Sequence, residues 1–389
     1  MKSLFGYGIT AKEIAKEGGW YIFDDNFKEI SFDEYGNKLL PSTLFEPEKS
    51  KLEITSPGIP PSHPLIQKAK NLISELDYYY NKNTFQIWIS GTNGKTTTTQ
   101  MTHYLLEDSE IGGNIGIPLG RLNPEKKWVI EVSSFQLYYT KTAKPNIFAL
   151  LPIKEDHTSW HGSFEEYKKA KLSPLNRMTQ RDVAILPYEF KDYPTKAYKI
   201  IYKSEKDFIK RFNFKKEFEV PFLLDEMIAK TIYYILNFKE KSLKEFKIDP
   251  HKLEEIRDYK DRLWVNDSKA TNKDATINAL KRYKNQKIHL IIGGVTKGQN
   301  FDELFKKLKK MDVVLYMIGK ETKELKELAK RFEIEYKITN SLKNSIKEID
   351  KNLKPKEVAL LSPACASFDM FKNYKQRGEE FKKLVKELK

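Results

Sequence analysis

The sequence predicts an α/β protein of three domains: a Rossmann-like first domain, a central domain with a phosphate loop on a parallel sheet, and a Rossmann-like C-terminal domain. Three observations lead to this prediction. A chain of 389 residues is too long for a single ordinary core. Short apolar runs rich in β-branched and aromatic residues alternate with stretches of helical spacing. Many of these runs end in glycine or polar residues, as strands do at the ligand-binding edge of a parallel sheet.

The composition indicates a folded protein without a membrane-spanning segment. Hydrophobic residues make up 40% of the chain and aromatic residues 13%, which is typical of globular proteins. No apolar run approaches the roughly 20 residues that span a bilayer, and Gly6 interrupts any secretory apolar region. The single cysteine, Cys365, excludes an internal disulfide. We therefore expect a cytoplasmic location and no membrane insertion.

The charge of the chain favours anionic ligands. Lys and Arg number 69 against 54 Asp and Glu, which gives a formal net charge of +15. The lysines are dispersed on helix-like stretches such as 306–310 and 382–386, without interleaved aromatic residues or a recognisable nucleic-acid module. We expect phosphorylated small molecules as partners and no nucleic acid. The alternative is a nucleotide-regulated nucleic-acid-binding protein.

The first segment, residues 1–84, has the order of a small nucleotide-binding unit. Ser3–Thr10 predicts a strand that ends in a glycine turn, without the third glycine of the dinucleotide fingerprint. Trp20–Asp25 predicts a second strand that ends in carboxylates, where an acid can bind a ribose or a uracil ring. A strand at Leu52–Thr55 runs into Ser56–Pro61, a rigid turn whose backbone can face a ligand. We place the first domain boundary near Thr84.

The central segment, residues 85–248, begins with a phosphate loop. Phe85–Ile89 predicts a buried strand, the loop GTNGKT follows at Gly91–Thr96, and Thr97–Leu106 has helical spacing. The loop is a shorter variant of the usual phosphate loop, which has a glycine where this chain has Ile89.

Four residues of this loop suit a nucleoside triphosphate. Gly91 and Gly94 let backbone N–H groups approach an oligophosphate, and the following helix N-terminus adds positive potential. Lys95 supplies a cation, and the hydroxyl of Thr96 can bind Mg²⁺.

Polar residues follow two more predicted strands of the central segment. Trp128–Val132 carries Glu131, a carboxylate that can hold Mg²⁺ beside the phosphate loop. Asn146–Leu151 delivers Glu155, Asp156 and His157 in the same way. A lysine-rich helix follows at 164–172, and a helix at 221–238 closes the domain.

The third segment, residues 249–389, repeats the pattern of strands that end in polar turns. A strand at Trp264–Asn266 runs into Asp267–Asn272, and two buried strands precede Gly293 and Gly319. The strand at 358–361 ends in the string SPACASFD, residues 362–369. Ligands bind at such strand ends in α/β domains.

Motifs spread over nearly the whole chain resemble one family. They are SPGIPPSHP, GTNGKTTTT, GGNIGIPL, EVSSFQL, EDHTSWHGSFEEYKKAKL, NDSKATN, GGVTKG and LSPACASFDMFKNYKQRGEEF. Together they resemble the Mur ligases, the ATP-dependent amide-bond formers of peptidoglycan precursor synthesis. NDSKATN and SPACASFDMFKN are similar to the members that add D-glutamate, and the DNPR signature of other members does not occur in this sequence.

The resemblance implies a ligase reaction. ATP would phosphorylate the carboxylate of UDP-N-acetylmuramoyl-L-alanine, and the amine of D-glutamate would attack the acyl phosphate. Phosphoryl transfer needs positioning and charge neutralisation, which a lysine and two Mg²⁺ ions would supply. We expect ATP and Mg²⁺ as cofactors and a monomeric protein. The alternative is another Mur-type or folylpolyglutamate-type ligase with a different amino acid substrate.

The resemblance also implies the site residues. The catalytic group would be Lys95, Glu131, His157 and Lys171. The first Mg²⁺ would lie at Thr96 and Glu131, and the second at His157 and at Lys171 carbamylated by CO₂, although residue type alone predicts an exposed helix lysine there. ATP would contact Gly91, Thr92, Asn93, Gly94, Lys95, Thr96, Thr97, Lys252 and Asp267. The UDP substrate would contact Gly8, Ile9, Thr10, Asp24, Ser56, Gly58, Asn114, Ser133 and Gln136. D-Glutamate would contact Lys269, Thr271, Lys297, Ser367 and Tyr374.

The sequence departs from the family pattern in three places. The HNxxN element of the last helix of the central domain is absent, and residues 224–228 (LDEMI) stand there. Where the family often has Gly-Leu-Pro-His-Arg, this chain has Ile248–Lys252, and lysine lacks the planar fork of arginine. The second half of the first domain matches nothing beyond the SPG turn.

Overall fold

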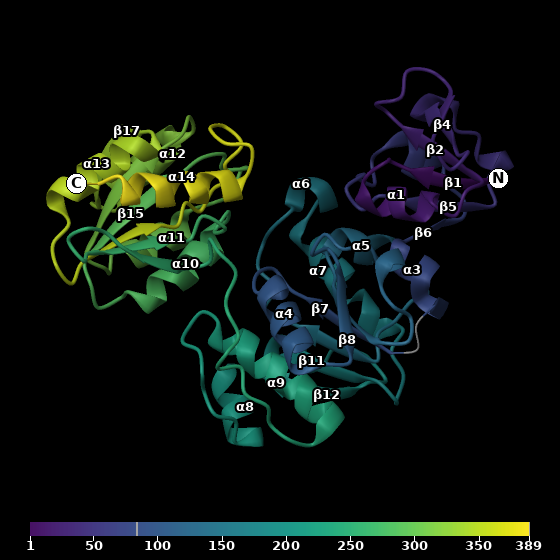
Figure 1. Cartoon of the computed structure of the whole chain (residues 1–389), viewed down its shortest axis with the longest axis horizontal. Helices are drawn as coiled ribbons and strands as arrows, with labels where there is room; N and C mark the ends of the chain where they lie inside the picture. The colour runs from purple at the N-terminus through teal and green to yellow at the C-terminus, as the bar shows by residue number, and fades with distance from the viewer. Residues whose placement is uncertain (83–84, 389) are drawn as a thin grey trace. The chain divides into compact units, whose positions relative to one another are not determined.

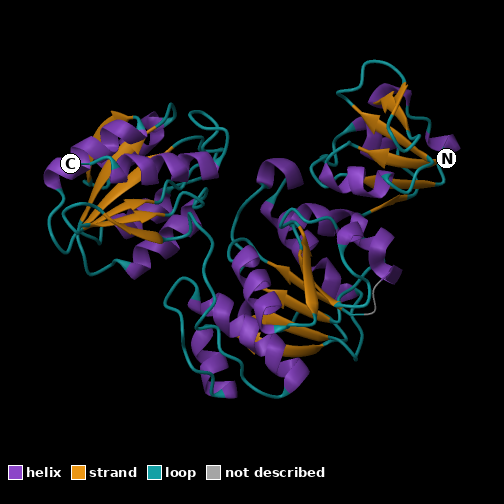
Figure 2. Ribbon diagram, viewed as in Figure 1, coloured by secondary structure: helices purple, strands orange, loops and turns teal. Residues whose placement is uncertain are grey.

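The computed structural model describes residues 1–82 and 85–388, which form three six-stranded sheets with helices packed on them (Figures 1 and 2). The predicted boundary near residue 84 lies outside the described residues. Short 3₁₀ helices occur at Ser42–Leu44, Pro47–Lys49, Tyr80–Lys82, Leu119–Arg121, Ser173–Asn176 and Tyr188–Phe190. No helix of the described part is long and apolar enough to cross a bilayer.

The N-terminal sheet has the strand order β3-β4-β2-β1-β5-β6, and all its pairs are parallel except β3 with β4. Because β1 lies between β2 and β5, the glycine turn after β1 lies between the ends of those two strands. The elements are β1 (Lys2–Phe5), α1 (Ile9–Ala15), β2 (Trp20–Asp24), β3 (Ser31–Phe32), β4 (Lys38–Pro41), β5 (Leu52–Thr55), α2 (Pro64–Lys68), β6 (Leu72–Ile73) and α3 (Glu75–Tyr79).

The central sheet is parallel throughout, with the order β12-β11-β10-β7-β9-β8. Its strands are β7 (Gln86–Ser90), β8 (Ser109–Gly113), β9 (Lys127–Glu131), β10 (Ile147–Leu150), β11 (Val183–Pro187) and β12 (Tyr198–Tyr202). Its helices are α4 (Lys95–Leu105), α5 (Ser134–Tyr139), α6 (Thr158–His161), α7 (Phe164–Leu172), α8 (Glu205–Phe212) and α9 (Leu223–Asn237).

Helix α4 is rich in threonine, a residue that disfavours helix interiors because its hydroxyl competes for backbone groups. Here the hydroxyls of Thr99 and Thr102 donate to the carbonyl four residues earlier, at distances of 2.8 and 2.7 Å, and the hydroxyl of Thr98 donates to Asp225 at 2.8 Å while lying 3.2 Å from Gly94 O. The three side chains are fully buried, so these bonds satisfy hydroxyls that water does not reach.

The C-terminal sheet has the order β13-β14-β18-β15-β16-β17, and only β13 runs antiparallel to its neighbour. Its strands are β13 (Glu254–Arg257), β14 (Leu263–Asn266), β15 (Ile288–Gly293), β16 (Val313–Ile318), β17 (Glu335–Asn340) and β18 (Val358–Leu361). Its helices are α10 (Lys273–Arg282), α11 (Asp302–Leu308), α12 (Thr322–Arg331), α13 (Leu342–Asn352) and α14 (Tyr374–Lys386).

The cores explain how these sheets are held. Leu4 of the N-terminal sheet and Trp88 and Trp128 of the central sheet belong to one buried cluster, so the first two sheets share apolar packing. The C-terminal sheet has its own cluster, which includes Trp264 and Phe381. The chain accordingly divides into two compact units, Met1–Glu217 with Leu223–Phe246, and Phe218–Phe222 with the residues from Lys247 onward. The predicted fold class is confirmed, whereas the domain boundaries stay predictions.

Candidate active site

The phosphate loop lies at the carboxyl end of β7, in the middle of the central sheet. Strands β10 and β9 flank β7 in parallel register, so the residues that follow them leave the sheet on either side of the loop. Strand order reverses at β7, and ligands of open α/β sheets bind at such a switch point. The fold therefore brings the predicted phosphate-binding, acidic and histidine segments to one edge.

The glycines of the loop permit a close backbone approach. Gly91 has a φ of 141°, and a Cβ atom there would lie 2.5 Å from the Cβ of Leu151. Gly94 has a φ of 88°, and its Cβ would lie 2.4 Å from Oδ1 of Asp225. Larger residues would therefore clash as well as strain the backbone. Helix α4 begins directly after Gly94, two residues earlier than the sequence predicts.

Lys95 folds back over the loop. Its Nζ donates to the carbonyl oxygens of Gly91 (3.0 Å) and Thr92 (2.8 Å). The hydroxyl of Thr92 donates to Lys154 O (3.0 Å) and lies 2.9 Å from the hydroxyl of Tyr167. Burial lowers the pKa of Lys95, while the charges of Glu131 and Asp156 oppose this effect. The remaining predicted phosphate contacts occupy the same loop and the first turn of α4, namely Asn93, Thr96 and Thr97.

Glu131 ends β9 next to the loop and is 3% exposed. Its Oε1 accepts a hydrogen bond of 2.6 Å from Nδ2 of Asn114. Its Oε2 is buried, and none of the described residues offers it a hydrogen-bond partner. A buried carboxylate oxygen without a donor is costly unless a cation meets it. Glu131 therefore fits a Mg²⁺ ligand, and the predicted Asn114 lies against the same side chain.

Lys171 is the unexpected residue of the site. It lies on α7 and is 1% exposed, and its Nζ donates 2.7 Å to Gly91 O, the carbonyl that Lys95 also contacts. Among the described residues no carboxylate forms an ion pair with this amine, which lies 4.9 Å from the ring centroid of Tyr167. Burial, and then the charge of Lys95, lower the pKa of Lys171 well below its usual value, although the charges of Asp156 and Glu131 oppose this effect.

His157 directly precedes α6, and its side chain is 42% exposed. Its backbone has a φ of 53°, and its ring packs against Phe135 with centroids 4.7 Å apart. Nε2 lies 3.6 Å from Asp156 Oδ2. The fold brings His157 to the phosphate-loop edge in the loop between β10 and α6, and its contact with a metal ion stays a prediction.

The first domain gathers several predicted UDP contacts at one edge. Asp24 ends β2, and its Oδ2 accepts from the backbone N–H of Tyr7 in the glycine turn (2.7 Å). The hydroxyl of Ser56 is buried without a partner among the described residues and lies 3.8 Å from the position of a Cβ on Gly8. The turn after β1, together with the exposed Ile9 that begins α1, thus lies between Asp24 and Ser56, because β1 pairs with both β2 and β5.

Four other predicted contacts of the UDP substrate have structural partners. Ser133 and Gln136 form a capping box at the start of α5, where the hydroxyl of Ser133 accepts from Gln136 N (3.2 Å) and the side chain of Gln136 accepts from Ser133 N (2.9 Å). The hydroxyl of Thr10 donates to Glu75 (3.5 Å), and Gly58 O accepts from Trp160 Nε1 (3.3 Å). Their contact with a substrate stays a prediction.

Asp225 lies at the phosphate loop, and the sequence analysis did not predict it as a site residue. It lies in the first turn of α9, is 4% exposed, and accepts a hydrogen bond of 2.8 Å from Thr98 on α4. Its Oδ1 also approaches Gly94. The available signal was the position itself, because residues 224–228 stand where the family has HNxxN.

Asp267 and Lys252, the predicted ATP contacts of the C-terminal domain, lie near the start of that domain. Asp267 follows β14 and accepts from Ser362 Oγ (2.7 Å) and Leu253 N (3.3 Å). Burial raises its pKa to about 7, and the hydrogen bond from Ser362 opposes this effect. Nζ of Lys252 donates to Asp249 (3.1 Å).

The predicted D-glutamate residues occupy loops after three neighbouring strands. Lys269 and Thr271 follow β14, Ser367 follows β18 and Lys297 follows β15, and these strands are adjacent in the sheet. Nζ of Lys269 lies 5.8 Å from the ring centroid of Tyr374 at the start of α14. Thr271 is not a helix cap, because the side chain of Asn272 caps α10. The fold therefore gathers these residues at one edge of the sheet.

Comparisons with known proteins agree with this arrangement. A model of the Mur ligase middle domain matches residues 89–254, and one of the Mur ligase glutamate ligase domain matches residues 251–365. The chain is 49% identical to the UDP-N-acetylmuramoylalanine–D-glutamate ligase of Campylobacter jejuni strain RM1221, over 99% of both chains. It is 42% identical to the enzyme of the same description from Helicobacter pylori strain J99, over 98% of this chain and 99% of the relative.

Solved structures share the fold at low identity. The crystal structure of the UDP-N-acetylmuramate–alanine ligase MurC from Thermotoga maritima aligns with a TM-score of 0.56 at 16% identity, over 98% of each chain. A MurF structure from Acinetobacter baumannii aligns with a TM-score of 0.61 at 14% identity, over 97% of this chain and 90% of that one. From the match of both domain models and the identity to full-length relatives, the chain belongs to the Mur ligase family.

Proposed function

We propose that this protein ligates D-glutamate to UDP-N-acetylmuramoyl-L-alanine in peptidoglycan precursor synthesis, with hydrolysis of ATP to ADP and phosphate. The observation that carries the proposal is the phosphate-loop edge, where the half-buried Lys95 and the buried Lys171 both donate to Gly91 O and where Oε2 of Glu131 is buried without a partner among the described residues. The near full-length identity to D-glutamate ligases supports the choice of substrates. As a member of this family the protein uses ATP.

The reaction joins a carboxylate to an amine through an acyl phosphate. A carboxylate oxygen of the substrate attacks the γ-phosphorus of ATP, the bond to the β,γ-bridging oxygen breaks, and ADP leaves. The D-glutamate amine then attacks the acyl carbon, loses a proton and expels phosphate. No protein nucleophile is needed, because the protein positions the reactants and stabilises the charge that develops.

Lys95 and Thr96 would act on the phosphates. Lys95 is held on the loop carbonyls until the γ-phosphate offers stronger, charged acceptors. Thr96 and Oε2 of Glu131 would hold Mg²⁺, which when bound neutralises the phosphate charge. The dipole of α4 and the N–H groups of the loop would contact the same phosphates.

Lys171 would be carbamylated. A buried amine with a lowered pKa is neutral more often than a surface lysine, and only the neutral amine adds to CO₂. The nitrogen lone pair forms an N–C bond, one proton is released, and the side chain becomes an anion. That anion, together with His157, would hold the second Mg²⁺.

In the C-terminal domain the two lysines Lys269 and Lys297 would bind the carboxylates of D-glutamate, and Thr271, Ser367 and Tyr374 would complete the pocket. Lys252 and Asp267 would contact ATP. At the other end of the substrate, the edge formed by Gly8, Asp24 and Ser56 would bind the uridine diphosphate. The protein would work as a monomer in the cytoplasm, where its nucleotide substrates are made.

One assay tests the proposal. Phosphate release from ATP is measured with UDP-N-acetylmuramoyl-L-alanine present, across a panel of D- and L-amino acids. The proposal predicts stimulation by D-glutamate above the other amino acids. Stimulation by another amino acid or by folate substrates would assign a different ligase activity, and stimulation by DNA or RNA alone would contradict a ligase.

A further inference from the structure

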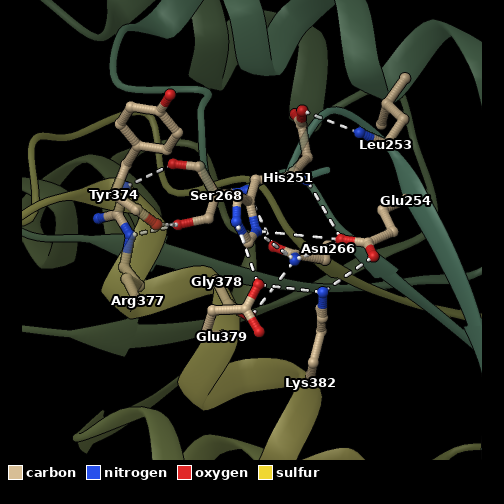
Figure 3. A network of polar contacts seen from close by, with 11 residues as sticks. His251, Leu253, Glu254, Asn266, Ser268, Tyr374, Arg377, Gly378, Glu379 and Lys382 are labelled. Atoms are coloured by element: carbon tan, nitrogen blue, oxygen red, sulfur yellow. Dashed lines mark hydrogen bonds and ion pairs between the residues drawn. The ribbon is translucent and has the colours of Figure 1, made fainter. Parts of the chain in front are cut away.

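Arg377 on α14 is fully buried and forms no ion pair with an acidic side chain among the described residues, although the charges of Asp369 and Asp267 act on it. Its guanidinium instead contacts the two loops after β14 and β18: Nε donates to Ser268 Oγ (3.0 Å), Nη2 to Ser268 O (2.8 Å), and Nη1 and Nη2 to Cys365 O (both 3.2 Å). Figure 3 shows the side chain projecting from α14 toward Ser268. A buried cation bonded to neutral groups is expensive, so its retention calls for a reason.

The two loops that Arg377 joins carry predicted D-glutamate contacts. Ser268 directly precedes Lys269, and Cys365 lies two residues before Ser367. The second loop also pairs with the loop after β15, because Val295 and Ala366 exchange hydrogen bonds of 2.9 and 3.0 Å. Lys297 follows two residues later. The guanidinium of Arg377 therefore bonds directly to the loops that carry Lys269 and Ser367. It is linked to the loop of Lys297 through the backbone pair of Val295 and Ala366.

The helix that carries Arg377 is part of the same arrangement. Ser268 Oγ accepts from Arg377 Nε and donates 2.8 Å to the backbone oxygen of Tyr374, one turn earlier on α14. Tyr374 is the predicted aromatic contact of D-glutamate. The backbone of the β18 loop is constrained as well, since Ala364 has a φ of 58°, a conformation that non-glycine residues keep only where their surroundings hold them.

Arg262 offers an internal comparison. It is also buried, at 5% exposed, but it pairs with Asp258 at 2.7 Å and with Asp350. It lies before β14, at the opposite end of the strand from Ser268. The same domain thus has one buried arginine neutralised by acids away from the predicted site and another bonded to the loops that form it.

We infer that Arg377 is a positioning residue for D-glutamate. It holds the loops that carry Lys269, Ser367 and Lys297 in fixed positions relative to one another. This inference rests on the proposed function. Lysine in its place keeps the charge but lacks the planar fork that reaches Ser268 and Cys365 together. Small displacements of positioning groups cost much of the rate, so the D-glutamate step is the one that should suffer.

The experiment is steady-state kinetics on the full chain with R377K, S268A and the control R262K. We expect R377K to raise the KM for D-glutamate by about tenfold or more, and to change the KM for UDP-N-acetylmuramoyl-L-alanine by less than about twofold. S268A should give a smaller rise in the KM for D-glutamate. In the double variant the two effects should not add, because both substitutions break the same hydrogen-bond network. R262K should lower the melting temperature and leave the KM for D-glutamate within about twofold. With R377A, added guanidinium should restore part of the affinity for D-glutamate.

Two results would overturn the inference: a folded R377K with an unchanged KM for D-glutamate, or a rise in R262K as large as in R377K. If R377K does not fold, an unchanged KM in S268A overturns it. Failure of the proposed function looks different, because the wild-type chain would then show no D-glutamate-dependent phosphate release. In that case the proposed function and the inference about Arg377 would both be wrong.

Discussion

Two buried lysines of the same compact unit have opposite surroundings. Lys230 on α9 is fully buried, and its Nζ lies 2.9 Å from Glu240, 3.0 Å from Glu226 and 3.3 Å from Glu217. Burial alone would lower its pKa, but the hydrogen bonds and charges of the three glutamates raise it. Lys171 is equally buried, but its amine contacts a carbonyl oxygen and an aromatic ring, and the charge of Lys95 acts on it.

The difference teaches how to separate a structural cation from a reactive one. Lys230 is compensated within the fold and has no chemistry left to perform. Lys171 has no carboxylate in ion-pair contact among the described residues, and burial and the charge of Lys95 outweigh the charges of Asp156 and Glu131, so its ammonium form is destabilised and its amine form is favoured. The fold tolerates such a group where a substrate, a metal ion or a modification completes it.

Replacing Lys171 by alanine should have the largest effect on catalysis. Loss of a group that holds charge at the reacting phosphate lowers kcat by on the order of 10²–10³-fold. The measurement is D-glutamate-dependent phosphate release. Short carboxylic acids such as acetate should restore part of the activity, because they supply the anion that the carbamate provides. If the K171A variant stayed active and carboxylic acids did not increase its activity, Lys171 would have no part in the mechanism.

Replacing Lys230 by methionine should lower the stability and leave catalysis unchanged, the reverse of what is expected at Lys171. Three glutamates lose their cation, so the free energy of unfolding should fall by about 3–5 kcal/mol, while kcat per folded molecule stays the same. K171M is the matched variant, and it should retain or raise the stability because it removes a buried amine that has no ion pair among the described residues. Urea unfolding of both variants checks this. Equal losses of stability would erase the distinction between the two lysines.

Glu131 and Glu226 extend the comparison to acids. Oε2 of Glu131 has no partner among the described residues, whereas Glu226 meets Lys230. E131Q should raise the Mg²⁺ concentration for half-maximal activity by at least about tenfold. E226Q should leave that concentration unchanged and lower the melting temperature. A normal Mg²⁺ titration of E131Q would contradict the assignment of Glu131 as a metal ligand.

The smallest predicted effect is on pH dependence. Asp258, beside Arg262, has a lowered pKa, whereas burial raises the pKa of Asp267 from 3.8 to about 7. Between those two values folded Asp267 keeps a proton that the unfolded chain has released, so its contribution to stability falls as pH rises from about 4 to about 7. The melting temperature of D267N should lack this decline. Parallel pH profiles for D267N and the wild type would refute the raised pKa.

The sequence predicts well whatever depends on neighbouring residues. The strand, glycine loop and helix around Lys95 need only local spacing, and the structure has them within two residues of the predicted positions. The positions of Glu131 and His157 at or after strand ends also followed from local pattern, whereas the structure supplies the strand order that places both strands beside β7. The capping box of Ser133 and Gln136 was readable as S-x-x-Q, although those residues were assigned to the substrate.

What depends on tertiary packing could not be predicted from composition and spacing. The burial of Lys171 arises because α7 lies against the phosphate loop, and helix spacing alone predicts an exposed lysine. Asp225 reaches Gly94 only because α9 packs on α4. Arg377 looks like one basic residue among many until its helix brings it beneath two loops.

The most direct test of the account is whether Lys171 takes up CO₂. The wild-type chain is equilibrated with ¹³C-bicarbonate, and the ¹³C NMR spectrum is recorded beside those of K171M and K230M. The account predicts a carbamate signal in the wild type and in K230M, no signal in K171M, and loss of the signal on acidification. Fully active wild-type protein without a carbamate signal, or a signal that persists in K171M, would contradict it.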